Sequence, residues 1–421
     1  MKIKDVARVI GGATPSTKHP EYYDGGIVWA TPKDLSDQGR KFFYSGGRTI
    51  SDLGLRSCAA EIIPADNILM SSRAPIGLIA INKVDCCTNQ GFKSLVLDRN
   101  LCDVDYMYYY MKYHIKEIEA LGSGTTFKEI SKSVFEQWDV VLPSLEKQKK
   151  IGSALAVIDE KIEINRLISD NLGKLVATIY NYWFVQFDFP NENGMPYKSS
   201  GGKMVWNEEL KRNIPEGWCV GNLYQIADFV NGLPCQKFRP LDSDNQLPVV
   251  KIKEMHNGIT PDTEYVRGDI PDKNIINNGD LIFSWSASLE VMVWNGGKAG
   301  LNQHIFKVIP KNGFSIHYVY EQISSYIVNF QAMAEARKTT MGHITADHLD
   351  QSRIVLPPPK LLREFESKVD TFFIGATKAA EENKHLESLR DFLLPLLMNG
   401  QVAFKKQKNN KLLKEGQFFE L

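Results

Sequence analysis

Two long stretches of the chain carry apolar residues at alternating spacings of three and four. In the first, eight of ten positions are apolar, along Ile151, Leu155, Ile158, Ile162, Asn165, Ser169, Leu172, Val176, Ile179 and Trp183. The second has the same count, along Phe365, Val369, Phe372, Ala376, Ala379, Asn383, Leu386, Arg390, Leu393 and Leu397. This spacing places the apolar residues on one face of a helix. Each stretch predicts a helix of roughly 35 residues, about 50 Å long.

The rest of the chain has the pattern of strands and polar turns, and this pattern occurs twice. Segments of the first half match segments of the second at offsets of 213 to 220 residues: 5–12 with 225–232, 66–75 with 279–288, 89–93 with 302–307, and 140–143 with 354–357. Short apolar runs separated by Gly, Ser and Asn are typical of strands and hairpins. We therefore predict two copies of one α/β unit, each followed by a long helix.

The equal lengths of the two helices predict how they pack. An apolar stripe can also belong to the core of its own domain, and that alternative stays open. A stripe of about 50 Å exceeds what one small domain covers, so we expect the helices to pair with each other. The predicted fold is α+β, with two pseudo-symmetric α/β domains joined by two long antiparallel coiled-coil helices and related by an approximate two-fold axis. The polar positions Asn165, Ser169 and Asn383 would cost stability but fix the register.

Composition changes along the chain set the predicted boundaries. The segment after the first helix is rich in Pro, Gly, Ser and Asn, which predicts a linker. The C-terminal end is rich in Lys and predicts a frayed basic tail that could contact phosphates. The predicted parts are a first domain (1–143), a central helix (144–187), a linker (188–217), a second domain (218–357), a C-terminal helix (358–400) and the tail (401–421).

Overall composition and charge exclude several classes of protein. With 43% apolar and 24% charged residues, the chain can bury substantial cores. The 50 basic and 50 acidic residues balance, so any contact with nucleic acid must come from local patches. The six cysteines form no Cys-x-x-Cys motif, and no apolar run resembles a signal peptide or membrane span. These features predict a protein of the reducing cytoplasm.

The sequence lacks the common motifs of catalysis. It contains no nucleotide-binding glycine loop, no nucleophile elbow, no His-Glu-x-x-His and no Asn/Asp-Pro-Pro-Tyr/Phe loop of amino-methyltransferases. Asp262 and Asp272 follow prolines as in some nucleases, but neither is followed by Glu-x-Lys. The eight histidines are scattered. We expect no catalytic residues, no metal site and no cofactor in this chain.

Several segments together resemble one protein family. They are residues 11–16 (GGATPS), 21–29 (EYYDGGIVW), 34–35 (DL), 214–218 (IPEGW), 279–285 (GDLIFSW) and 302–304 (NQH). With the duplication and the two long helices, they make nearly the whole chain similar to the specificity subunits of type I restriction-modification systems. In one respect the chain differs, because its first domain begins almost at Met1 without a lead-in like that at 214–218.

This resemblance implies a function without catalysis. The two target-recognition domains would each read one half of a split site on double-stranded DNA, and the helices would act as a ruler between the halves. The chain would dock two adenine methyltransferase subunits and two motor-nuclease subunits. S-adenosylmethionine, ATP and Mg²⁺ would then belong to those partners. Two alternatives stay open: the recognition part of a fused methyltransferase-nuclease, or a scaffold whose domains bind proteins or sugars.

Polar turns between apolar strands are where such domains can present groups to DNA. The candidates in the first domain are Lys33, Ser71, Ser72, Arg73, Asn89 and Gln90. In the second domain they are Lys251, Lys253, Ser284, Trp285, Ser286, Gln303 and His304. Asn-Gln recurs at 89–90 and 302–303, which favours a structural turn over sequence reading for these pairs.

A further turn precedes each long helix and is rich in small hydroxylated residues. Its candidates for binding phosphate are Ser123, Thr125, Thr126, Lys128, Lys338, Thr339, Thr340 and His343. Hydroxyls and exposed backbone N–H groups suit phosphate oxygens, which position a protein on DNA without specifying sequence. The alternative is that these hydroxyls cap helices.

Overall fold

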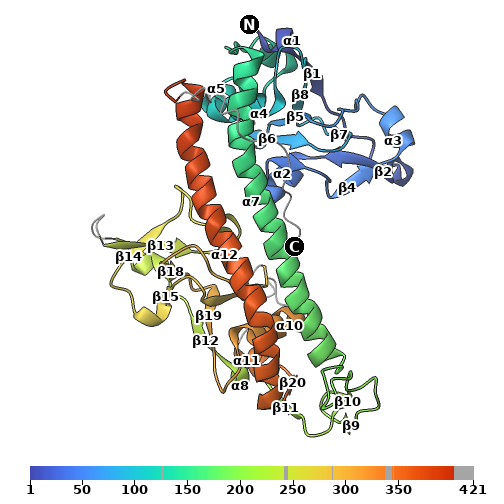
Figure 1. Ribbon diagram of the computed structural model, residues 1–421, viewed down its shortest axis with the longest axis vertical. Helices are drawn as coiled ribbons and strands as arrows, with labels where there is room; N and C mark the ends of the chain where they lie inside the picture. The colour runs from blue at the N-terminus through green and yellow to red at the C-terminus, as the bar shows by residue number, and fades with distance from the viewer. Residues whose placement is uncertain (125–127, 241–244, 287, 337–343, 345, 403–421) are drawn as a thin grey trace, which may run out of the picture. The chain divides into compact units, whose positions relative to one another are not determined.

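The two predicted long helices are α7 (Leu145–Tyr180) and α12 (Pro359–Met398) (Figure 1). The computed structural model describes residues 1–124, 128–240, 245–286, 288–336, 344 and 346–402. The chain forms two units, Met1–Ile164 with Asn383–Leu421, and Asn165–Glu382. The boundary between these units therefore falls inside both long helices. None of the described helices is both long and apolar enough to cross a membrane.

The first unit combines two sheets with short helices. Its strands are β1 (Ala7–Gly11), β2 (Tyr23–Ala30), β3 (Phe42–Phe43), β4 (Arg48–Ile50), β5 (Asn67–Ser72), β6 (Ile76–Asn82), β7 (Cys86–Thr88) and β8 (Lys93–Leu97). Its short helices are α1 (Ile3–Val6), η1 (Pro20–Tyr22), α2 (Pro32–Gln38), α3 (Asp52–Arg56), α4 (Val104–Tyr113), α5 (Ile115–Ala120) and α6 (Lys132–Glu136). One sheet has the order β1-β8-β5-β6-β3 and the other β4-β2-β7.

The second unit repeats this plan with additions. Its strands are β9 (Met204–Asn207), β10 (Arg212–Pro215), β11 (Cys219–Gly221), β12 (Ala227–Asn231), β13 (Gln246–Val250), β14 (Tyr265–Arg267), β15 (Ile275–Ile276), β16 (Leu281–Ser284), β17 (Glu290–Val293), β18 (Ala299–Leu301), β19 (Ile305–Pro310) and β20 (Ile354–Leu356). Its other helices are η2 (Asn181–Val185), α8 (Leu223–Ile226), η3 (Cys235–Lys237), α9 (Ile252–Asn257), η4 (Asp272–Asn274), α10 (Ile316–Ala336) and α11 (Ala346–Asp350). Its larger sheets have the orders β12-β19-β16-β17 and β14-β13-β18-β15.

The predicted duplication is confirmed at the level of strand register. The antiparallel order β1-β8-β5-β6 corresponds to β12-β19-β16-β17. Equivalent residues pair: Ile68 with Leu95 and Leu281 with Val308, Ala7 with Leu97 and Ala227 with Pro310. The first of these equivalences has the offset of 213 found in the sequence, and β1 and β12 are offset by 220.

The predicted antiparallel pairing of the helices is confirmed by contacts within each unit. In the first unit, the Asn383 side-chain amide donates to the Ile162 carbonyl at 3.1 Å. In the second unit, Asn165 donates to a Glu382 carboxylate oxygen at 2.7 Å, and the Ser169 hydroxyl donates to the Ala376 carbonyl at 3.0 Å. Rising residue numbers on α7 pair with falling numbers on α12. The polar ladder residues thus make hydrogen bonds between the helices, in one register.

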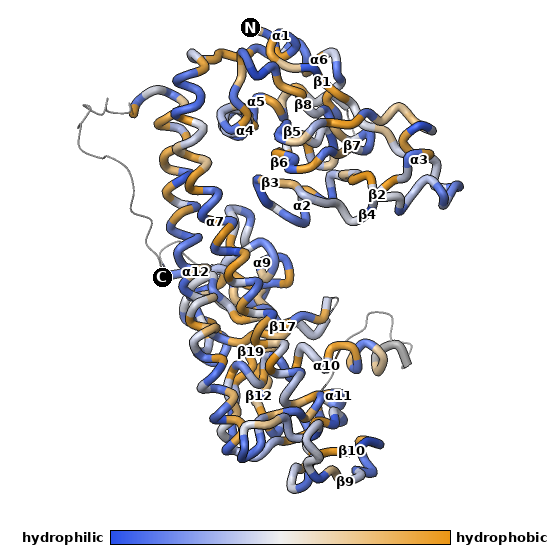
Figure 2. Tube along the Cα trace, turned by 45° about the vertical axis from the view of Figure 1, so that its right-hand side comes forward, coloured by the Kyte–Doolittle hydropathy of each residue, from blue (hydrophilic) through white to orange (hydrophobic). Residues whose placement is uncertain are grey.

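Hydrophobic and hydrophilic residues alternate along both helices (Figure 2). Ile151, Leu155 and Leu397 belong to a core of the first unit. Val176, Phe365 and other ladder residues belong to the main core of the second unit. Each domain therefore buries part of both helices, which unites the two packing alternatives stated above.

The predicted linker, 188–217, contains folded structure. Strands β9 and β10 form a hairpin in it, and Ile214 is buried in the core of the second unit. The linker prediction missed this hairpin because its two strands have only four residues each, too few for a clear alternation of apolar and polar positions.

Candidate nucleic-acid interface

Four segments predicted to contact DNA meet at one end of the first domain. The Asn89 amide donates to the Ala30 carbonyl at 3.0 Å, just before α2. The Ser72 amide donates to the Gly91 carbonyl at 2.7 Å, and the Ser72 carbonyl accepts from the Ile130 amide at 3.0 Å. These backbone hydrogen bonds join the start of α2, the 71–73 turn, the 89–91 turn and the segment that follows Lys128.

The same three hydrogen bonds recur in the second domain. The Asn302 amide donates to the Val250 carbonyl at 3.1 Å, and the Trp285 amide donates to the His304 carbonyl at 3.2 Å. The Trp285 carbonyl accepts from the Ile344 amide at 2.9 Å. Each partner stands 213 to 220 residues after its counterpart. Both domains therefore assemble their polar turns in the same way.

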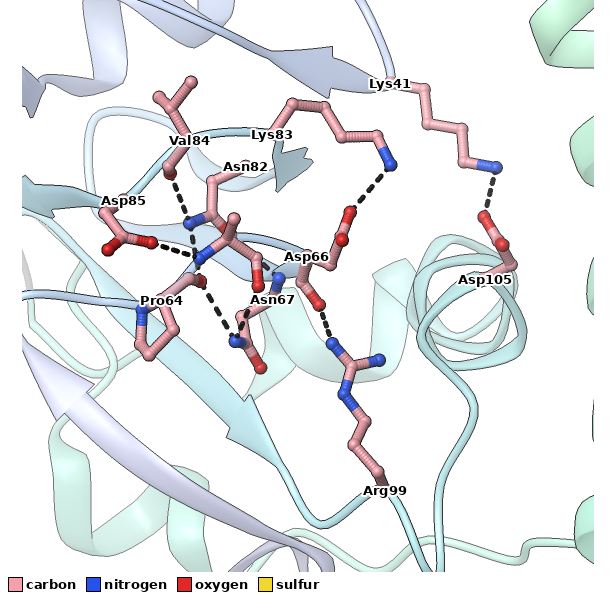
Figure 3. Close-up of polar contacts among 11 residues, drawn as sticks. Lys41, Pro64, Asp66, Asn67, Asn82, Lys83, Val84, Asp85, Arg99 and Asp105 are labelled. Atoms are coloured by element: carbon pink, nitrogen blue, oxygen red, sulfur yellow. Dashed lines mark hydrogen bonds and ion pairs between the residues drawn. The ribbon is translucent and has the colours of Figure 1, made fainter.

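A polar network fixes the base of the β5–β6 hairpin, whose tip carries Arg73 (Figure 3). The buried Asn82 amide donates to the carbonyls of Pro64 and Val84 at 2.8 and 2.9 Å, and its oxygen accepts from the Asn67 backbone at 2.9 Å. These contacts satisfy backbone groups that the chain reversal leaves unpaired. The hairpin is thus held at its base, which positions the tip.

Some predicted site residues are buried and hold the turns together. The hydroxyl of Ser71 donates to the Pro75 carbonyl and that of Ser284 donates to the Ser288 carbonyl, both at 2.7 Å. Neither serine is exposed to solvent. Asn89 accepts from the Gly91 amide at 2.9 Å, in the turn-bonding role given above as the alternative. Its counterpart Asn302 accepts from the His304 amide at 3.2 Å.

Replacing Ser71 by alanine is expected to destabilise the first domain by about 1 to 3 kcal/mol. The Ser71 hydroxyl also accepts from the Leu78 amide at 2.8 Å, so its removal leaves two backbone groups unpaired. Denaturant unfolding of the full chain measures the change. Ser123→Ala is the matched control, because Ser123 is exposed and its substitution should change stability by less than about 0.5 kcal/mol. Equal effects of the two substitutions would contradict the structural role.

The first domain presents a charged cluster at the hairpin tip. Arg73 lies 3.5 Å from Glu129, and Lys93 lies 3.4 Å from the same carboxylate and 3.3 Å from the Ser72 hydroxyl. A pocket of about 620 Å³ beside it is lined by residues 73–76, Glu119, Lys128 and Glu129. The sequence analysis did not select Lys93 and Glu129. Lys93 stands inside the repeated 89–93 segment, but only the folded chain brings Glu129 to it.

The second domain presents aromatic groups at the equivalent place. The rings of Trp285 and His304 lie 5.5 Å apart between centroids. The His304 Nδ1 atom is buried and has no hydrogen-bond partner among the described residues. Gln303 lies beside it, with its amide nitrogen 3.5 Å from the His304 Nε2 atom. Ser286 is buried. The equivalent turns of the two domains therefore differ in chemistry, charged in the first and aromatic in the second.

Two predicted lysines stand at the same position of equivalent helices. Lys33 in α2 and Lys253 in α9 are both exposed, and 33 and 253 differ by the repeat offset of 220. The carboxylates of the following residues, Asp34 and Glu254, accept from the backbone of the N-cap residues, which fixes each helix start. Lys251 lies 2.6 Å from Glu264, and its hydrogen bond and charge lower the pKa of Glu264.

The remaining candidates divide into two groups. Gln90 accepts a hydrogen bond from the Thr14 hydroxyl, and Lys128 is exposed at the pocket of the first domain. The candidates outside the described residues are Thr125, Thr126, Lys338, Thr339, Thr340 and His343. Within the described part of the chain, no three His, Cys, Asp or Glu side chains are grouped so that they could hold a metal ion.

Comparisons with known proteins match both halves of the chain. A family model for the type I restriction modification DNA specificity domain matches residues 1–173 and 215–366. The MjaIX type I restriction enzyme specificity subunit of Methanocaldococcus jannaschii is 28% identical, over 96% of this chain and 93% of its own. The HindI specificity subunit of Haemophilus influenzae is 22% identical, over 69% of this chain and 74% of its own.

One solved structure has a similar fold over most of its length. It is the crystal structure of a type I restriction-modification S subunit from M. genitalium, with a TM-score of 0.50 and 15% sequence identity. The alignment covers 94% of this chain and 95% of that one.

Proposed function

This chain belongs to the family of type I restriction-modification specificity subunits, and from that premise we propose that it is a non-catalytic subunit that reads a bipartite DNA site in the cytoplasm. The observation that carries the proposal is the match of the family model to both copies of the repeat. One copy would read each half of the site. Catalysis, with S-adenosylmethionine, ATP and Mg²⁺, would belong to the partner subunits.

The proposal assigns different roles to shared and divergent residues of the two domains. Residues that read different half-sites should differ between the copies, whereas residues that build the turns should be the same. Ser71 and Ser284 are shared and buried. Arg73 and its counterpart Ser286 differ, as do Ser72 and Trp285. We assign base reading to the divergent positions, chiefly Arg73 in the first domain and Trp285 with His304 in the second.

Lys33 and Lys253 are shared and exposed, so we assign them to phosphate contacts in both domains. A cation that contacts phosphate adds affinity for any sequence, and binding through it weakens as salt rises. A side chain that reads a base adds affinity for one sequence only. These two roles predict different behaviour on substitution.

The double variant Lys33→Ala, Lys253→Ala is expected to weaken binding to all duplexes and to reduce the slope of log affinity against log salt by about 2. Arg73→Ala is expected to cost about 1 to 3 kcal/mol on the cognate duplex and to relax the preference at one half-site only. Fluorescence anisotropy over a salt series, with cognate and mutated half-sites, measures both. A uniform loss in Arg73→Ala would move Arg73 to the phosphate class.

An exposed apolar stripe on α7 supports the docking of a partner. Val157, Ile164, Ile168 and Leu175 are all exposed, and their spacings of seven, four and seven place them on one helix face. Contiguous exposed apolar residues are typical of protein interaction sites. We propose that this stripe, the α7 stripe, binds the methyltransferase subunit. Two methyltransferase and two motor-nuclease subunits would complete the complex.

The experiment that tests the proposed function compares methylation of the host genome with and without this gene. Sequencing that reports methyladenine should reveal a split motif in the wild type. That motif should disappear on deletion and return when the gene is supplied again. The methyltransferase encoded beside the gene should co-purify with the chain. An unchanged pattern of methylation together with no co-purifying methyltransferase would overturn the proposal.

A further inference from the structure

A pocket of about 220 Å³ lies inside the second unit, bounded by α7, α10, α12 and β17. Most of its wall is apolar, with Leu172 and Phe372 among the lining residues. Small residues leave the space open: a Cβ built on Gly173 would meet no atom within 4 Å, and Ala376 stands among the residues of the facing helix. A cavity of this size accepts a ring-sized apolar group. The pocket lies on a different face of α7 from the α7 stripe.

Two hydrogen-bond acceptors line this pocket without a donor. Glu321 of α10 is only 7% exposed, and its carboxylate makes no hydrogen bond or ion pair with any described residue. The side-chain oxygen of Asn295, just after β17, is also buried and has no partner among the described residues. Buried acceptors without donors cost free energy. A donor placed in the pocket would recover that cost at both groups.

The surroundings of Glu321 supply no positive charge to balance it. Burial alone raises the pKa of Glu321 to about 7. The ionisable side chains on the surrounding elements are Tyr180 of α7, Tyr320 and His317 of α10, Glu290 of β17, and Glu366 and Asp370 of α12. Burial raises the pKa of both tyrosines and lowers that of His317, so these three are neutral near pH 8. A cation entering the pocket would therefore be its first positive charge.

We propose that this pocket binds an ammonium or guanidinium group carried on a ring-sized apolar stem. The cation would donate to Glu321 and Asn295, and the stem would fill the apolar wall formed by α7 and α12. The group has two sources of the same chemistry, a free small amine or a Lys or Arg side chain of a docked subunit. Only the second source rests on the proposed function, and the site itself is tested on the isolated full-length chain.

The test titrates the chain with benzylamine by calorimetry and uses benzyl alcohol as the uncharged probe. Benzylamine should bind wild type at least about tenfold more tightly than it binds Glu321→Gln. Benzyl alcohol should bind both proteins equally weakly. From pH 8 to pH 6 the affinity of wild type for benzylamine should fall by about tenfold as Glu321 takes up a proton, and Glu321→Gln should lack that fall.

Two further variants separate the site from general effects. Gly173→Leu should abolish benzylamine binding, because its side chain enters the open space, while the helix remains folded. Glu364→Gln, in an exposed part of α12, is the matched control and should bind like wild type. Circular dichroism and melting temperature verify that each variant is folded. No binding to wild type, or equal binding to wild type and folded Glu321→Gln, would overturn the proposal.

A last comparison identifies the source of the cation. If a subunit side chain fills the pocket, the purified complex with the methyltransferase should no longer bind benzylamine. If the natural ligand is a free amine, the complex should bind benzylamine like the isolated chain. A failure of the chain to bind DNA or methyltransferase would leave the calorimetry on the isolated chain unaffected, so the two proposals fail separately.

Discussion

Replacing Arg390 by methionine is expected to lower the free energy of unfolding of the first unit by about 3 kcal/mol. Arg390 lies 2.8 Å from Asp159, whose side chain is only 5% exposed. The Tyr109 hydroxyl of α4 donates to the other oxygen of the same carboxylate. Without Arg390, Asp159 would be a buried charge with no cation. Chemical denaturation followed by circular dichroism measures the loss.

A second substitution separates the loss of the pair from the cost of the orphaned charge. The double variant Asp159→Leu, Arg390→Met removes both charges and should be markedly more stable than Arg390→Met alone. Arg363→Met, on the same helix and exposed, is the matched control and should change stability by less than about 0.5 kcal/mol. If Arg390→Met were as stable as Arg363→Met, the ion pair would have no role in holding α12 to the first unit.

Replacing Ile164 and Ile168 by aspartate is expected to weaken the complex with the methyltransferase by about 100-fold or more. Both side chains are exposed in the α7 stripe, so the free chain should fold as before. In a complex they would become buried, and each carboxylate would then lose its water without gaining a partner. Co-purification and analytical ultracentrifugation measure the loss, and genome methylation should fall with it.

The matched control for the stripe is Lys174→Asp. Lys174 is exposed on α7 about a quarter turn from the stripe, and its substitution also changes charge. It should leave the complex intact. Full assembly by the folded double aspartate variant would show that the partner docks elsewhere.

The candidate interface could be predicted in part. The sequence identified Arg73, Lys33 and Lys253 because polar residues between apolar strands are visible in the order of residues. It also selected Ser71 and Ser284, whose hydroxyls are buried. Sequence order does not distinguish a turn hydroxyl that faces solvent from one that closes the turn. It also gave no signal for Glu129, because the contact with Lys93 spans 36 residues.

The sequence by itself determined the duplicated architecture, the two long helices and the antiparallel pairing. These follow from periodicity, which is a local property repeated along the chain. Only the tertiary structure decided that four turns meet through three backbone hydrogen bonds in each domain. It also decided that Arg390 pairs with Asp159 and that Glu321 is buried without a partner. Burial and pairing depend on which distant segments come into contact, and a linear pattern of apolar and polar residues does not specify those contacts.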